Sequence, residues 1–258
     1  MNNNSKFFDS VMYGARMSIK EITLVSPNKG KQYCSVKGAI ITLAEGGKPI
    51  YREIDLIVRG DAAKKILWRH QDAWPKFSEK EGKAWFADIN VGSLSSASFR
   101  KKDGTVGACL KGRLLKITAL QIGKETVFGQ FADTIQKPLL VTPCYVNFLD
   151  VAKKEARVSM LDGKTDEPTY HNINLVLDEV EVFTLLETQG MAPRGWQYKN
   201  EDTKVFAILE IADFRAEGFE DKDKNPKSCL RGSVAGIRYL KAGDSVLVGR
   251  REESSQAA

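Results

Sequence analysis

The chain has 258 residues, of which 42% are hydrophobic and 28% are charged, with a formal net charge of +6. This length suffices for two domains of ordinary size, and the composition is that of a globular protein. No apolar run approaches the ~18–20 residues that cross a bilayer, and the first residues lack the apolar core of a secretory signal. We therefore expect a cytoplasmic protein.

The residues that usually carry catalysis are scarce. Four cysteines, at positions 34, 109, 144 and 229, are scattered and form no Cys-x-x-Cys motif, which argues against a disulfide framework or a zinc site. With only His70 and His171, a histidine-based triad or a metal site of several histidines is nearly excluded. The sequence therefore predicts a non-enzymatic protein with no cofactor and no metal.

An internal repeat dominates the sequence. Cys109-Leu110-Lys111-Gly112 returns 120 residues later as Cys229-Leu230-Arg231-Gly232, and Phe86 and Phe99 return as Phe206 and Phe219. Solenoid units run to roughly 20–50 residues, so a repeat of this length has the size of a domain. We therefore predict two copies of one small fold.

The first copy reads as five strands and one helix. Alternation and turn residues predict strands over 16–25, 32–43, 50–58, 85–99 and 108–122, and a helix that begins near Asp61. The apolar phase of the first strand shifts by one residue at Lys20-Glu21, which indicates a β-bulge. A bend is expected at Gly92, and residues 1–13 form an arm whose apolar side chains dock on a core.

The second copy repeats this order, with strands expected over 145–151, 156–161, 169–177, 204–214 and 229–240 and a helix over 178–189. The order β-β-β-α-β-β is the plan of the oligonucleotide/oligosaccharide-binding (OB) fold. We predict a mainly β protein with two tandem OB-fold-like five-stranded Greek-key barrels, each with a helix between strands three and four. An open α+β sheet is the alternative. The expected domains are 1–130 and 144–250, with a linker over 131–143 and a disordered tail over 251–258.

Charge is distributed unevenly between the copies. Residues 1–130 carry 22 basic and 12 acidic side chains, whereas the remainder carries 17 basic and 21 acidic ones. A strongly basic domain is typical of a protein that binds a polyanion, and an ordinary solvated surface is the alternative reading.

Candidate binding residues lie where an OB fold would use them. Single-stranded nucleic acid is held by a basic groove and by aromatic faces on which bases stack. The loops between strands one and two and between four and five flank the binding face of this fold. The candidates are Lys29, Lys31, Tyr33, Lys37, Phe86, Phe99, Arg100, Lys101, Lys102, Lys111 and Arg113. Core packing is the alternative for Phe86 and Phe99, because both copies keep them.

A resemblance to a known family also favours a protein that acts on nucleic acid. The residues that carry it include Phe7-Phe8-Asp9, Gly14, 19–22, 29–31, 55–60, 92–94, Phe99, Gly104 and 110–115. With these residues, the first 130 positions resemble an uncharacterised bacterial family carried on plasmids and integrative-conjugative elements. The resemblance implies a protein that acts on DNA during replication or transfer of a mobile element.

These observations predict an accessory protein that binds single-stranded DNA, with RNA as the other candidate ligand, and with little sequence preference. The second copy is expected to mediate self-association or to recruit a replication or transfer protein. A protein-interaction scaffold that does not touch nucleic acid is the alternative function.

Overall fold

The computed structural model describes residues 7–26, 32–44, 46–77, 83–150, 152–178 and 205–249. The chain forms two compact units. One contains the described residues of Val11–Leu139 and Asp213–Leu230, and the other those of Met1–Ser10, Leu140–Ala212 and Arg231–Ala258. The domain boundaries expected from the sequence remain a prediction.

The first unit contains a closed barrel of five strands, β2 (Val11–Val25), β3 (Tyr33–Leu43), β4 (Pro49–Val58), β5 (Trp85–Arg100) and β6 (Val106–Ile122). β2 pairs antiparallel with β3, β3 with β4, and β6 with β5, while β4 and β6 pair in parallel. β5 pairs back onto β2, which closes the ring. This strand order, with the helix α1 (Asp61–Trp68) between β4 and β5, is that of the OB fold. The predicted fold is confirmed.

A β-bulge allows β2 to pair with both β3 and β5. The pairing of β2 with β3 shifts register between Ile19 and Glu21, which is where the apolar phase of the sequence shifts. Ile19 and Ile22 are consequently both buried, on either side of the shift. The bulge bends the strand, so that one end pairs with β5 and the whole strand closes the barrel.

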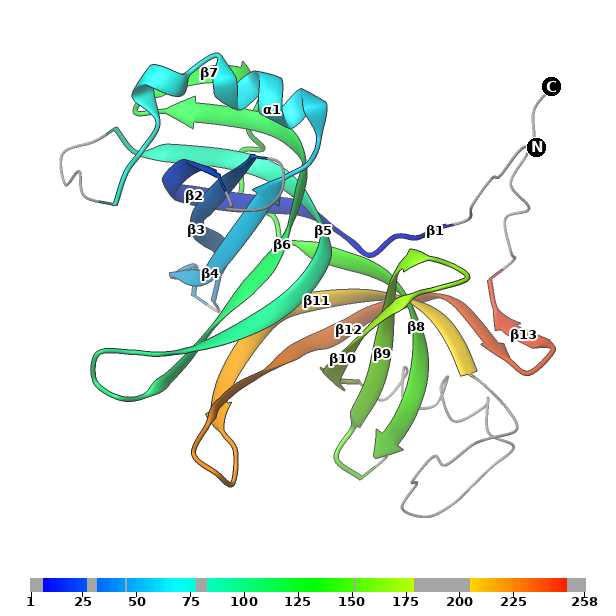
Figure 1. Cartoon of the computed structure of the whole chain (residues 1–258). Coiled ribbons are helices and arrows are strands. Elements are labelled where there is room, and N and C mark those ends of the chain that lie inside the picture. The colour runs from blue at the N-terminus through cyan, green and yellow to red at the C-terminus, as the bar shows by residue number, and fades with distance from the viewer. Residues whose placement is uncertain are drawn as a thin grey trace, which may run out of the picture. The chain divides into compact units, whose positions relative to one another are not determined.

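Helix α1 covers one end of the barrel. Its buried side chains are Ala63, Ile66 and Leu67, and the indole nitrogen of Trp74 donates to the Leu67 carbonyl at 2.9 Å. Trp85, only 1% exposed, lies in the barrel core. Figure 1 shows α1 and the short strand β7 (Glu125–Gly129) at this end, with the β5–β6 hairpin at the opposite end.

The second copy repeats the barrel with β8 (Leu139–Asp150), β9 (Glu155–Lys164), β10 (Thr169–Val176), β11 (Val205–Glu220) and β12 (Pro226–Ala242). β8 pairs with β9 and β11, β9 pairs with β10, and β12 lies between β10 and β11. Residues 179–189 of the helix expected over 178–189, and the tail expected over 251–258, lie outside the described residues. Among the described helices, none has the length and apolar character that crossing a membrane requires.

The described residues of the N-terminal arm up to Ser10 belong to the second unit, whereas residues 11–13 of the expected arm begin β2 in the first unit. Strand β1 (Phe7–Phe8) pairs with β9, and the Phe8 ring lies 6.3 Å from the ring of Phe206. The buried Ser10 hydroxyl lies 2.7 Å from the Thr142 hydroxyl and donates to the Leu161 carbonyl at 2.8 Å. Sequence reasoning expected the arm to dock on a core but did not identify the strand.

Two further short strands, besides β1, were not expected from the sequence. β7 pairs with the end of β6, and β13 (Ser245–Val248) pairs with the end of β12. Both follow turns at equivalent glycines, Gly123 with φ +63° and Gly243 with φ +54°. These hairpins extend the last strand of each barrel and are a further shared element of the repeat.

Gly112 and Gly232 occupy equivalent places where strands approach closely. A Cβ on Gly112 would lie 2.7 Å from Val91 Cγ1, and one on Gly232 would lie 3.1 Å from the carbonyl oxygen of Ala212. The glycine in the repeated tetrapeptide is therefore required by packing.

We predict that Gly112→Val destabilises the protein by about 1–3 kcal/mol, because a larger side chain overpacks the core at this position. Urea unfolding measures the change. Lys116→Val is the control, since Lys116 is an exposed position on the same strand. A Gly112→Val protein as stable as the control would contradict the packing role.

Candidate nucleic-acid interface

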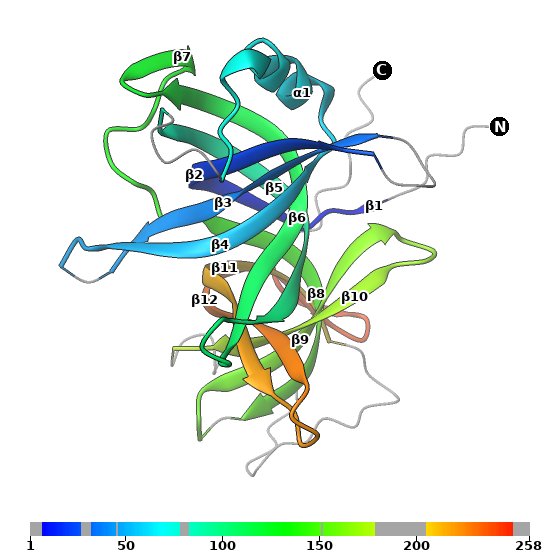
Figure 2. The ribbon, with the colours of Figure 1, turned by 60° about the vertical axis from the view of Figure 1, so that its left-hand side comes forward.

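β3, β4 and β6 are neighbouring strands of the first barrel (Figure 2), and we call their outward sides the first-barrel face. In OB folds generally, the loops between strands one and two and between strands four and five flank this surface. Strand register places one row of charged residues across this face and the adjoining β2, in the order Glu21, Lys37, Asp55 and Lys111. Charges of opposite sign therefore alternate along the row.

Lys37 is held within this row. Its ammonium lies 3.0 Å from a carboxylate oxygen of Glu21. The hydrogen bond with Glu21 raises the pKa of Lys37, and the charge of Asp55 adds to that effect. Its side chain is still 43% exposed, so Lys37 can reach a ligand only in competition with Glu21.

Lys111 and Arg113 are accessible cations of the first-barrel face. Both are exposed and two residues apart on β6, so their side chains point to the same side. Arg113 is in register with Ile57 of β4, an apolar neighbour. Neither side chain has an ion pair or hydrogen bond within the described part of the chain. These two residues are thus available to an anionic ligand.

Tyr33 lies on the outward side of β3, in the same phase as Lys37 and four residues from it. It is half-buried, and it is in register with Val25 of β2. At about 3.3 Å per residue, roughly 13 Å separates Tyr33 from Lys37 along the strand. The predicted residues Lys29 and Lys31, in the neighbouring loop, lie outside the described residues.

The β5–β6 hairpin carries the predicted basic loop, and Arg100 in it is already engaged. Its guanidinium forms an ion pair with Glu220 at 2.7 Å and also donates to the carbonyls of Gly104 and Lys224. Lys101 and Lys102 are exposed. Of the three predicted cations in this loop, Arg100 therefore has a structural role, and Lys101 and Lys102 are the accessible ones.

The equivalent hairpin of the second copy, between β11 and β12, contributes its tip to the same compact unit. The Ser98 hydroxyl donates to the Pro226 carbonyl at 3.0 Å, and the Ser96 and Ser228 hydroxyls lie 3.0 Å apart. Val106 approaches Gly218 so closely that a Cβ there would lie 2.9 Å from Val106 Cγ1. The two hairpins thus contact each other along both of their strands.

The two predicted phenylalanines are not equivalent. Phe99 packs its ring over Gly107, where a Cβ would lie 2.6 Å from the ring. Phe86 is half-buried, in register with Ser18 and Gln121. It lies nine residues along β5 from Ser95, the residue paired with Lys111. Gly92, the residue paired with Arg113, is six residues from Phe86, so roughly 20 Å of strand separates Phe86 from Arg113 and roughly 30 Å separates it from Lys111. The structure does not bring Phe86 together with these cations.

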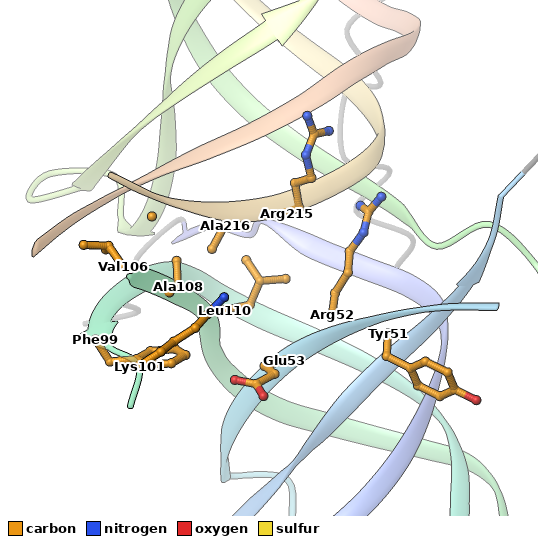
Figure 3. A pocket seen from close by; sticks show the side chains of 12 residues that line it. Tyr51, Arg52, Glu53, Phe99, Lys101, Val106, Ala108, Leu110, Arg215 and Ala216 are labelled. Carbon is orange, nitrogen blue, oxygen red and sulfur yellow. The ribbon is translucent and has the colours of Figure 1, made fainter. Parts of the chain in front are cut away.

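A cavity of about 460 Å³ lies where the first-barrel face meets the β5–β6 hairpin. In Figure 3 the Lys101 side chain extends toward Leu110, and the guanidinium groups of Arg52 and Arg215 point in one direction. A cavity of this size falls in the range of about 300–1,000 Å³ typical of small-molecule sites. Its lining includes Tyr51, Arg52, Glu53, Phe99, Lys101, Leu110 and Arg215.

The two arginines of the cavity are held by carboxylates. Arg52 donates to the Phe214 carbonyl at 3.3 Å and lies 3.9 Å from Asp213, and burial lowers the pKa of its guanidinium. Arg215 forms an ion pair with Glu217 at 2.8 Å. Sequence reasoning missed these residues. Tyr51 shares the outward phase of Asp55 and could have been found from that alternation, whereas Arg215 lies in the other copy.

Three of the four cysteines are buried, which makes their thiols poor nucleophiles. Burial raises the pKa of Cys34 to about 11 and also raises the pKa values of Cys109 and Cys144. These thiols therefore stay protonated at neutral pH. Among the residues that the structure describes, no cluster of three or more histidine, cysteine, aspartate or glutamate side chains could hold a metal ion.

Residues 1–135 match the family described as "Protein of unknown function (DUF3577)". The chain belongs to this family. The match contains the entire first barrel and confirms the expectation that the first half belongs to an uncharacterised family. Among solved structures, the chain is similar to a deletion mutant of the single-stranded DNA-binding protein from Thermus aquaticus, with 12% identity and a TM-score of 0.39, over 90% of this chain and 94% of that one. No curated protein matches the sequence. At this TM-score the fold assignment rests on the strand pairings of the chain itself.

We predict a measurable coupling between Arg100 and Glu220, because their ion pair joins the two hairpins. A double-mutant cycle with Arg100→Ala and Glu220→Ala, followed by urea unfolding, should give about 0.2–1 kcal/mol, the range of exposed pairs. Lys102→Ala with Glu220→Ala is the control cycle, since Lys102 is an exposed lysine of the same hairpin. Equal coupling in the two cycles would contradict a specific Arg100–Glu220 interaction.

Proposed function

We propose that the chain binds single-stranded DNA through the first-barrel face, with little sequence preference, as a non-enzymatic accessory factor in replication or transfer of a mobile genetic element. The observation that carries the proposal is the pair Lys111 and Arg113, two exposed cations on the outward side of an OB barrel. OB folds bind oligonucleotides on this side of the barrel, between the two flanking loops.

The surroundings of this pair fit an extended, flexible polyanion. Lys101 and Lys102 continue the positive charge onto the β5–β6 hairpin. Tyr33, half-buried on β3, and Tyr51, 59% exposed on β4, offer aromatic surface on the same face. Phosphates would contact the cations and bases would stack on the rings, which makes binding tolerant of sequence. The cavity beside Lys101 has room for part of a nucleotide.

The mobile-element role rests on the family resemblance of the first half. A factor that coats or delivers single strands during replication or transfer needs affinity without base readout. The mixture of lysines, arginines and tyrosines on the first-barrel face supplies contacts of that kind.

We predict that Lys111→Glu with Arg113→Glu weakens binding of a fluorescein-labelled oligo-dT by at least about tenfold at low salt, because two phosphate contacts become repulsive. Fluorescence anisotropy across a salt series measures the effect. The slope of log affinity against log salt should become shallower by roughly 1.4, at about 0.7 per lost phosphate contact on a single strand. An oligo-rU probe measured in parallel distinguishes DNA from RNA.

The control variant is Arg69→Glu with Lys124→Glu, which makes the same charge change at exposed positions beside α1 and β7. It should bind like the unaltered protein apart from a small general charge effect. An unaltered protein that does not bind oligo-dT at low salt would refute the proposed function. Equal affinities of the two variants would remove the first-barrel face from the site.

A further inference from the structure

The second barrel carries a face equivalent to the first-barrel face, on the outward sides of β9, β10 and β12, which we call the second-barrel face. Arg157 of β9 is in register with Phe148 of β8 and with Asn174 of β10. Leu175 Cδ2 lies 3.6 Å from the place of a Cβ on Gly232, which sets β12 beside β10. The row that corresponds to Glu21, Lys37, Asp55 and Lys111 is therefore Phe148, Arg157, Asn174 and Arg231.

The first half of the sequence is more basic than the second, but the row of the second barrel is more basic than the row of the first. In the second row an aromatic ring replaces Glu21 and an amide replaces Asp55, while both cations are kept as arginines. The first row thus sums to zero formal charge, and the second sums to +2. The half with the acidic overall composition has the more basic row on the corresponding face.

The local geometry presents these groups outward. The pairing of β8 with β9 shifts register between Val146 and Phe148, at the place of the bulge in β2, and this shift leaves the Phe148 ring half-exposed. The Arg157 guanidinium lies 6.0 Å from the Phe148 ring, and its Nε donates to Asn174 Oδ1 at 3.4 Å. Arg157 has no carboxylate partner among the described residues, and Arg231 is exposed.

The neighbouring row adds hydrogen-bonding groups. Asn147 donates to the Ser159 hydroxyl at 2.7 Å, and Ser159 donates to Asn172 Oδ1 at 3.0 Å. Tyr170, in the same outward phase of β10, is 56% exposed. Glu155, exposed and two residues from Arg157 in the same outward phase of β9, adds one carboxylate to this face, and Asp150 at the β8–β9 turn pairs with Lys153 at 3.3 Å.

We propose that the second-barrel face is a second binding site for single-stranded DNA. Arg157 and Arg231 contact phosphates, the rings of Phe148 and Tyr170 stack with bases, and Asn174 orients the Arg157 guanidinium. Guanidinium groups suit phosphate recognition, and aromatic faces accept any base. The site rests on the proposed function for its ligand alone and uses no residue of the first-barrel face. It assigns to the second copy a role in strand binding in place of the expected self-association.

The test uses the full chain and labelled oligo-dT in anisotropy titrations across a salt series. Arg157→Glu with Arg231→Glu should lower the affinity at least about tenfold and make the salt slope shallower by roughly 1.4. Phe148→Ala should weaken binding by about 5- to 150-fold, the equivalent of roughly 1–3 kcal/mol per stacked base, with little change of slope. Phe148→Tyr keeps the ring and should bind like the unaltered protein.

The matched control is Lys164→Glu with Lys241→Glu, which makes the same charge change on the same barrel outside the row. Thermal unfolding of each variant separates a lost contact from a lost fold. If Arg157→Glu with Arg231→Glu lowers the midpoint of thermal unfolding, the comparison of Phe148→Ala with Phe148→Tyr decides whether the second-barrel face binds DNA.

The outcomes separate the two proposals. Loss of affinity in the second-barrel variants alone supports the second site even if the Lys111 and Arg113 variant binds normally. Normal binding by all second-barrel variants, with loss in the Lys111 and Arg113 variant, overturns the second site and keeps the proposed function. Sedimentation velocity adds a third outcome, because an oligomer that dissociates in the Arg157 and Arg231 variant with unchanged DNA affinity would show a protein contact instead.

Discussion

The parallel pairing of β4 with β6 is the constraint on which the first barrel depends. Parallel neighbours cannot be joined by a tight turn, so the chain between them must leave the sheet and return. Here that crossover supplies α1 and β5, the helix that covers the barrel end and the strand that closes the ring onto β2. The same pairing sets Asp55 beside Lys111 and Ile57 beside Arg113. The register of one strand pair thus determines both the closure and the composition of the candidate binding face.

Much of the fold was predictable because it follows from patterns that are visible in the sequence. Alternation located the main strands, the phase shift at Lys20-Glu21 located the bulge, and the 120-residue offset predicted the second barrel. The candidate site was only partly predictable, since it depends on pairings between distant strands. Sequence alone did not indicate that Glu21 would form an ion pair with Lys37, or that Glu220 would form one with Arg100. It also placed Phe86 with cations that lie far along the strand, because strand phase gives the side of a sheet but not the position along it.

The net charge of each half of the sequence did not predict the charge of the residue row on its barrel face. The first half of the sequence is strongly basic, but two of the carboxylates on its sheet lie in register with its lysines. The second half is mildly acidic, but the corresponding row contains arginines, an amide and an aromatic ring. Neighbours across strands lie within about 5 Å of each other, well inside the screening length of ~8–10 Å in physiological salt. Pairwise register therefore matters more for a bound strand than the composition of a domain.

The contact between the two hairpins has a consequence for how such a chain can arise. Ser98 contacts Pro226, and Val106 contacts Gly218. At the 120-residue offset Gly218 is the equivalent of Ser98, and Pro226 is the equivalent of Val106. The two contacts are therefore equivalent, with the two copies exchanged. Reciprocity of this kind characterises an isologous interface between identical subunits related by a two-fold axis. A protein with a single barrel could form this contact only as a homodimer, with occupancy that depends on its concentration. The tandem chain makes the contact intramolecular, so dilution does not separate the two hairpins and each copy is free to change its own surface.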